Sequence, residues 1–119
     1  IHGDLHLRNL IYDEGEVGII DLDNAGPGDP AGDLGSLAAS LHYRELTGQG
    51  GSAEELIETI LTAYGKLRSD LFSLDSVNWH ISYAALCERA SRCLTRVKLQ
   101  PQGIVSALLD VAEEYIQRS

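Results

Sequence analysis

The strongest constraint on the fold of this chain is a change of pattern near residue 33. Up to that point the sequence is rich in Gly, Asp and Asn, and "AGPGDP" (25–30) holds glycines and prolines that neither a helix nor a central strand accommodates. From Leu34 onward, apolar residues recur with a helical period. The pattern therefore predicts a short non-helical segment followed by a helical subdomain.

The non-helical segment contains two short runs typical of β-strands. They are "NLIY" (9–12) and "VGII" (17–20), and "DEGE" (13–16) joins them. This arrangement predicts a small β-hairpin, after which the Gly- and Pro-rich loop leads into the helices.

The first two predicted helices have clear apolar faces. In the first, Leu34, Leu37 and Leu41 fall on one side. The second begins with a capping box formed by Ser52 and Glu55. Its apolar stripe consists of Leu56, Ile57, Ile60, Leu61, Tyr64 and Leu67.

Two further helices are predicted in the second half. The third covers "SLDSVNWHISYAALCERASRCLTRVKL" (73–99), with Asp75 or Ser76 as its N-cap. Its expected inward residues are Trp79, Tyr83, Leu86, Ala90, Leu94 and Val97, and its expected solvated face carries Arg89, Arg92 and Arg96. Pro101 suits the start of the fourth helix, "QGIVSALLDVAEEYIQR" (102–118). The predicted fold class is α+β, predominantly α-helical, with a short hairpin and about four helices.

The charge of the chain limits its partners. Its 119 residues have a formal charge of −9 at pH 7. Nucleic acids and anionic membranes bind basic surfaces, so this charge argues against both and suits a cationic substrate. No apolar run approaches the roughly 20 residues that cross a bilayer. Cys87 and Cys93 fall on different faces of one predicted helix, and reduced thiols of this kind indicate a cytoplasmic protein.

The first ten residues hold the strongest candidates for chemistry. Asp4 and Asn9 match the Asp-x-x-x-x-Asn spacing of the kinase catalytic loop, where Asp accepts the substrate hydroxyl proton and Asn holds Mg²⁺. The metal needs a second carboxylate ligand. Asp21 follows the second strand, so the hairpin is expected to return it to the side of this loop.

Two stretches carry a resemblance to a known family. "HGDLHLRNL" (2–10) and "GIIDLDNAGPGDPAGDLGSL" (18–37) together resemble the C-terminal lobe of the aminoglycoside phosphotransferase family, small-molecule kinases related to protein kinases and choline kinases. The resemblance is close over residues 1 to about 41 and implies the C-terminal lobe of a protein-kinase-like fold. It also implies that ATP, with Mg²⁺, donates its γ-phosphoryl group to a hydroxyl of a small molecule.

The resemblance implies roles for several polar residues of the first segment. Asp4 would be the catalytic carboxylate, and Asn9 and Asp21 would bind Mg²⁺. Asp23 is an additional candidate for the metal site. Asp33 would support the catalytic loop by accepting hydrogen bonds from its backbone N–H groups.

The remaining polar residues of the loop have less specific roles. His2 would be structural and pack behind the loop. His6 and Arg8 lie between the catalytic carboxylate and the metal ligand, where a hydrogen-bonding or cationic group can meet the transferred phosphoryl oxygens.

Two other interpretations stay open. His2, Asp4 and His6 occupy alternate positions, a pattern that could serve a metal-dependent hydrolase with zinc or iron. That reading leaves the other candidate residues unexplained. The chain could also be a kinase-derived binding module without catalysis, although all the expected polar groups are present.

Residues 1–119 are interpreted as a single C-terminal lobe, with catalytic and metal-binding loops in 1–33 and a helical subdomain in 34–119. Phosphoryl transfer also needs an N-terminal lobe that covers the nucleotide, and the chain has no segment that matches one. We therefore expect a fragment that is inactive in isolation and that associates with itself or a partner chain. The acceptor is expected to be an aminoglycoside or a related amino alcohol or sugar, and a cationic one because the chain is acidic.

Overall fold

The computed structural model describes residues 1–95 and 103–119. A 3-10 turn (Leu7–Asn9) leads into the strands β1 (Leu10–Asp13) and β2 (Glu16–Ile19). The helices are α1 (Pro30–Leu46), α2 (Ala53–Leu67), α3 (Leu74–Tyr83), the π-helix η2 (Ala84–Ala90), α4 (Ser91–Thr95) and α5 (Ile104–Arg118). Since α3, η2 and α4 follow one another directly, the described residues form four helical segments and one hairpin. The predicted fold class, α+β and mainly helical, is confirmed at this level.

The hairpin is antiparallel and pairs Leu10 with Ile19 and Asp13 with Glu16. Its two-residue turn has positive φ at both Glu14 (47°) and Gly15 (83°), which is the backbone that matches the right-handed twist of the strands. The predicted hairpin is therefore confirmed. Most of its side chains are exposed on both faces.

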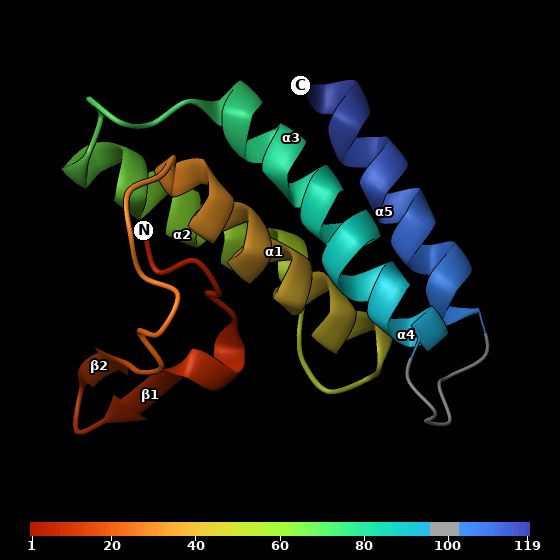
Figure 1. Ribbon diagram of the computed structural model, residues 1–119, viewed down its shortest axis with the longest axis horizontal. Helices are drawn as coiled ribbons and strands as arrows, with labels where there is room; N and C mark the ends of the chain where they lie inside the picture. Colours follow the sequence, from red (N-terminus) through yellow and green to blue (C-terminus); the bar gives the residue numbers. More distant parts are fainter. Residues whose placement is uncertain (96–102) are drawn as a thin grey trace.

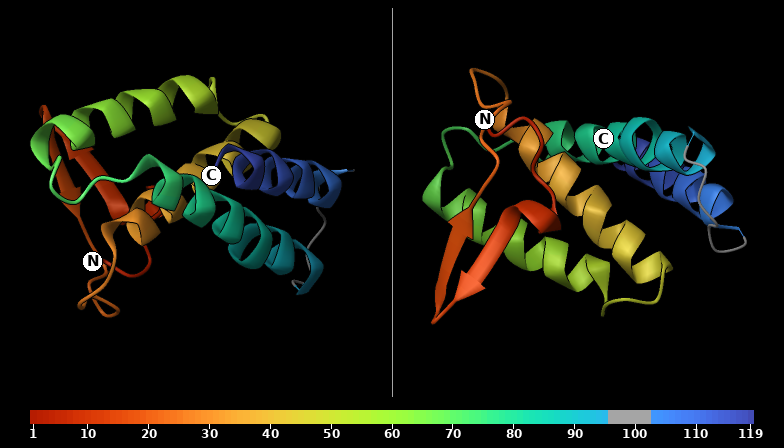
Figure 2. Two further views of the ribbon diagram at one scale, coloured as in Figure 1. Left: turned by 90° about the horizontal axis from the view of Figure 1, so that it is seen from above. Right: turned by 60° about the horizontal axis from the view of Figure 1, so that its bottom comes forward.

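Helix α1 lies at the centre of the helical body (Figures 1 and 2). It packs against α2 on one side and against α3 and η2 on the other, while α5 packs along α3 and η2. The main core joins these elements through Ala31, Leu34, Ala38, Leu41, Ala53, Ile57, Val77, Ile81 and Tyr115. The buried positions of the first predicted apolar face, Leu34, Leu37 and Leu41, are confirmed.

Small residues bring α1 and α3 close together. A Cβ added at Gly35 would lie 2.6 Å from the backbone carbon of His80, so only glycine fits there without a shift of a helix. On the other side of α3, the Ser82 hydroxyl donates a hydrogen bond of 2.6 Å to the Ala112 carbonyl of α5. Helix α3 is thus enclosed on two sides at short distance.

The inward-facing residues of the third helical segment differ from the prediction. Trp79, Tyr83, Leu86 and Leu94 were expected inside but are 48, 49, 48 and 72% exposed, respectively. The inward residues of α3 and η2 are Val77, Asn78, Ile81, Ser82, Ala84, Ala85 and Ala90. The closely spaced helices enclose compact side chains such as valine, isoleucine, serine and alanine, and the wider turn of the π-helix changes which residues share a face. Of the expected inward residues only Ala90 is buried, and Val97 lies outside the described residues.

The helix starts predicted from the sequence are confirmed only in part. The Ser52 hydroxyl accepts a hydrogen bond from the Glu55 N–H, so the predicted cap of α2 is confirmed. Helix α3 is capped by Ser73, not by Asp75 or Ser76. In the α2 stripe, Ile57 is buried, and Ile60, Leu61 and Tyr64 pack on the core. The predicted inward positions of Leu56 and Leu67 are wrong, since they are 48 and 81% exposed.

The start of the last helix also differs from the prediction. Helix α5 begins at Ile104, and Gly103 precedes it with a φ of 78°. The proposed role of Pro101 lies outside the described residues. No helix of the described part of the chain is both long and apolar enough to cross a membrane.

Candidate functional site

The N-terminal loop is held by the first turn of α1. The Asp33 carboxylate accepts one hydrogen bond from the His2 N–H (2.7 Å) and another from the Gly3 N–H (3.0 Å). Asp29 caps the same helix by accepting a hydrogen bond of 2.9 Å from the Ala31 N–H. Because both oxygens of Asp33 are engaged, the loop is fixed against α1 at two successive residues.

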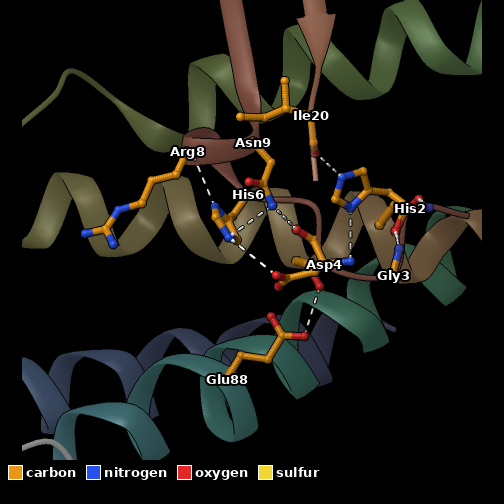
Figure 3. A network of polar contacts seen from close by, with 10 residues as sticks. His2, Gly3, Asp4, His6, Arg8, Asn9, Ile20 and Glu88 are labelled. Atoms are coloured by element: carbon orange, nitrogen blue, oxygen red, sulfur yellow. Dashed lines mark hydrogen bonds and ion pairs between the residues drawn. The ribbon is translucent and has the colours of Figure 1, made fainter. Parts of the chain in front are cut away.

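His2 connects the loop to the end of the hairpin (Figure 3). Its buried ring accepts a hydrogen bond at Nδ1 from the Asp4 N–H (3.2 Å). The proton of the neutral ring is therefore on Nε2, which donates to the Ile20 carbonyl at 2.8 Å. Both ring nitrogens of His2 are used in this way to hold the backbone.

Gly3 allows a second loop to close over the first. Its φ is +87°, a conformation that favours glycine, and an added Cβ would lie 2.5 Å from the Asn24 carbonyl oxygen. Nearby, the Ile1 amino group donates to the Gly26 carbonyl at 2.6 Å, and the Gly26 N–H donates back to the Ile1 carbonyl. The loop after β2 is thereby packed on the N-terminal loop.

Asp4, His6 and Asn9 form a compact polar group (Figure 3). The buried Asn9 donates a hydrogen bond from Nδ2 to the Asp4 carbonyl (2.9 Å). His6 Nδ1 accepts a hydrogen bond from the Arg8 N–H (3.2 Å), and its Nε2 lies 3.3 Å from Asn9 Nδ2 and 3.7 Å from Asp4 Oδ2. Since the amide nitrogen of Asn9 is committed to the loop, its Oδ1 is the atom left for a ligand.

Asp21 is placed beside Asn9 by the end of the hairpin. The Ile20 N–H donates to the Asn9 carbonyl at 2.9 Å, and Asp21 is the next residue. Asp21 is exposed and has a φ of 60°, in the left-handed region that Asp tolerates better than most residues. Asp23 follows at an exposed position of the same loop.

The environment of His6 favours its neutral form. Partial burial lowers the pKa of His6, the Asp4 carboxylate opposes this effect, and the charges of Arg89, Arg92 and Arg8 lower the pKa further. Three arginines from different parts of the chain thus act on one ring.

The alternative metal site of a hydrolase is not favoured. Both nitrogens of His2 are hydrogen-bonded to the backbone, so neither is free for a metal. Over residues 1–95 and 103–119, no three His, Cys, Asp or Glu side chains are grouped so as to hold a metal ion.

The chain is similar in sequence to a known protein family. A family model described as the phosphotransferase enzyme family matches residues 1–79. The chain belongs to this phosphotransferase family. The matched residues include the N-terminal loop, the hairpin, α1 and α2. Comparison with curated proteins and with solved structures gives no match.

The N-terminal loop also borders a pocket that the sequence did not indicate. His6, Arg8, Tyr43, Arg44, Arg89 and Arg92 are among the residues that line it. The prediction that the arginines of the third helix form a solvated face is wrong for Arg89, whose Nε is buried. Arg96 lies outside the described residues. An arginine on a helix is common on solvated faces, so no local signal distinguished these residues.

Glu88 is another residue near the N-terminal loop that sequence reasoning missed. It accepts a hydrogen bond of 3.0 Å from the Ser36 hydroxyl of α1. Figure 3 shows its side chain pointing from η2 toward the loop that carries Asp4. The position of Glu88 depends on the packing of η2 on α1, and no motif in the sequence includes this residue.

Proposed function

We propose that this chain is the C-terminal, catalytic lobe of a kinase that transfers the γ-phosphoryl group of ATP to a hydroxyl of a small molecule. One observation carries the proposal. In a member of the phosphotransferase family, the loop that bears Asp4 and Asn9 is hydrogen-bonded both to α1 and to the strand end that precedes Asp21. This brings a candidate base and two candidate metal ligands to one end of the hairpin.

Asp4 acts in this proposal on the acceptor hydroxyl. Its carboxylate accepts the hydroxyl proton as the acceptor oxygen bonds to the γ-phosphorus and the bond to the bridging oxygen of ADP breaks. The hydrogen bonds to the Asp4 backbone, donated by Asn9 and accepted by His2, orient the carboxylate. Correct positioning supplies most of the rate in phosphoryl transfer.

Asn9 and Asp21 are the residues that would hold Mg²⁺. The Asn9 Oδ1 and the Asp21 carboxylate are the hard oxygen ligands that Mg²⁺ prefers, and Asp23 is a further candidate. When bound, Mg²⁺ neutralises charge on the phosphate oxygens. His6 lies beside Asp4, with Nε2 3.7 Å from Asp4 Oδ2, and this nitrogen can donate a hydrogen bond to a transferred phosphoryl oxygen when it carries the proton.

A nucleotide-covering lobe would complete the site. The hairpin exposes apolar side chains that include Ile11 (50%), Tyr12 (75%), Val17 (65%) and Ile19 (53%). Tyr12, Val17 and Ile19 share one face of the hairpin in this register, and exposed apolar side chains grouped in this way are typical of an interface. We propose that an N-terminal lobe covers it in the complete enzyme, and that residues 1–119 alone are inactive and self-associate.

The test is turnover by the full-length protein that the gene encodes, with ATP, Mg²⁺ and pooled hydroxyl compounds. Asp4→Asn is expected to lower kcat by about 10²–10⁴-fold with little change in ATP binding, because it removes the base and keeps the shape. Asp21→Asn is expected to weaken Mg²⁺-dependent ATP binding. Asp13→Asn removes an equal charge in the hairpin and is the control. Near-normal turnover by the Asp4 variant would refute its assignment, and no ATP consumption with any pool would refute the kinase.

A further inference from the structure

The pocket beside the catalytic loop is lined by positive charge. Its volume is about 280 Å³, close to the lower end of the range for small-molecule sites. Arg8 comes from the loop, Arg44 from α1, Arg89 from η2 and Arg92 from α4. These are four of the nine basic residues of the chain, and no carboxylate is among the described lining residues.

These arginines lack ionic partners among the described residues. The ion pairs present there between Arg and a carboxylate involve only Arg68 and Arg118. Arg44 donates from Nε to the Gln49 carbonyl (2.9 Å), which leaves its charge uncompensated. The nearby Glu88 carboxylate accepts a hydrogen bond from Ser36 and does not line the pocket.

Arg89 is the most costly of the four to leave without a counterion. Its Nε is buried and has no hydrogen-bond partner, and its guanidinium lies 5.7 Å from the centroid of the Tyr43 ring. Burial lowers the pKa of Arg89 and the charge of Arg92 adds to this effect, while the Glu88 carboxylate, which is not hydrogen-bonded to Arg89, opposes it. Arginine stays protonated near neutral pH even so, and a buried charge without a partner is unfavourable. An anion in the pocket would relieve both penalties.

The charge of the pocket lining is opposite in sign to the net charge of the chain. The chain has a formal charge of −9, which by itself suits a cationic acceptor. Charges separated by more than about 8 Å are largely screened at physiological ionic strength, so a ligand inside the pocket responds mainly to the lining arginines. Guanidinium groups bind carboxylates and phosphates through paired hydrogen bonds.

We propose that this pocket binds an anionic oxygen group of the acceptor, which is therefore a small hydroxy acid or a phosphorylated hydroxy compound. The proposal rests on the proposed kinase function and deepens it. His6 belongs both to the pocket lining and to the polar group around Asp4. An acceptor whose anionic end binds the arginines can therefore present its hydroxyl to Asp4.

The first experiment measures anion binding without nucleotide. Inorganic phosphate and L-malate are titrated into the chain by calorimetry, with circular dichroism as the check on folding. Arg92→Gln is expected to weaken binding at least tenfold, because Arg92 is exposed and can be replaced without disturbing the core. Arg8→Gln is a second, independent variant. Arg68→Gln removes the same charge from an exposed pair with Asp70 and should bind as the parent does.

The second experiment compares acceptors with the full-length enzyme. Hydroxy acids, sugar phosphates, neutral sugars and amino sugars are assayed separately with ATP and Mg²⁺. We expect turnover of an acidic class, and Arg92→Gln should raise KM for that acceptor at least tenfold while KM for ATP changes little. An increase confined to KM for ATP would assign the pocket to the nucleotide phosphates and overturn the inference.

The two experiments separate the inference from the proposed function. Turnover of only neutral or cationic acceptors would keep the kinase and refute the anionic acceptor. Absence of phosphate and malate binding by the chain would also refute the inference. Anion binding that depends on Arg92, without turnover of any acceptor, would support the anion site and refute the kinase.

Discussion

The spacing between α1 and α3 offers the sharpest test of this structure, through the substitution Gly35→Ala. An alanine Cβ at this position would lie 2.6 Å from both the backbone carbon and the Cβ of His80, and 2.8 Å from its carbonyl oxygen. Backbone atoms cannot rotate away, so one helix must move. We therefore place the overpacking cost at the upper end of the usual range, about 3 kcal/mol. The higher helix propensity of alanine offsets about 1 kcal/mol of this.

The expected net effect of Gly35→Ala is a loss of about 2 kcal/mol in the free energy of unfolding, or roughly 8 °C in Tm. Gly32→Ala is the matched control in the same helix. Its added Cβ would be 4.0 Å from the His80 ring, an ordinary contact, so the variant should gain up to about 1 kcal/mol from helix propensity. The two variants should thus differ by about 3 kcal/mol.

Urea unfolding followed by circular dichroism at pH 7.5 measures both variants. A Gly35→Ala protein as stable as the parent, or one stabilised like Gly32→Ala, would refute the close approach of α1 and α3. The same approach brings Tyr43 of α1 to the guanidinium of Arg89 in η2. The spacing of these helices therefore also determines the shape of the arginine-lined pocket.

Two further predictions concern the N-terminal loop and a buried histidine. The substitution Asp33→Asn replaces one of the two oxygens that accept hydrogen bonds from His2 and Gly3 with an NH₂ group that faces an N–H. We expect the free energy of unfolding to fall by about 1–3 kcal/mol and kcat to fall as well. Parent-like values of both would contradict this. Burial lowers the pKa of His42, whose Nε2 lies 2.8 Å from the Tyr115 hydroxyl. As the pH falls below about 6.5, the unfolded chain therefore binds more protons at this residue than the folded chain does, and the free energy of unfolding decreases. The charged groups that modify this pKa are Glu45, Glu54, Glu114 and Arg118. The His42→Gln variant should therefore lose less stability than the parent between pH 7.5 and 5.5 in urea titrations. Other titrating groups, including His6, are common to both proteins, so equal losses would show that His42 does not cause the pH dependence.

Local features of the chain could be predicted because their partners are close in sequence. The hairpin depends on two short apolar runs and a Glu-Gly turn, and the contacts of Asp4 with His6 and Asn9 span five residues or fewer. The Ser52 cap of α2 likewise involves one turn of chain. In each case the spacing of residue types restricts the geometry before any tertiary contact is made.

The faces of the third helical segment could not be predicted in this way. An α-helical period applied to residues 73–99 selects the largest apolar side chains, including Trp79 and Leu86, as the inward ones. The structure instead buries Val77, Ile81, Ser82 and three alanines, because α1 and α5 approach from two sides and Gly35 allows a close contact. The π-helix then changes the phase of the segment at the residues that reach the pocket.

The sequence by itself determined the family, the hairpin and the density of polar groups in the first 33 residues, since these depend on short-range spacing. Only the tertiary structure decided which charged side chains lie near one another. Arg8, Arg44, Arg89 and Arg92 are spread over 85 positions and line one pocket because α1, η2 and α4 pack beside the N-terminal loop. Net charge is a property of composition, whereas the charge that a ligand meets depends on which side chains lie within a screening length of it.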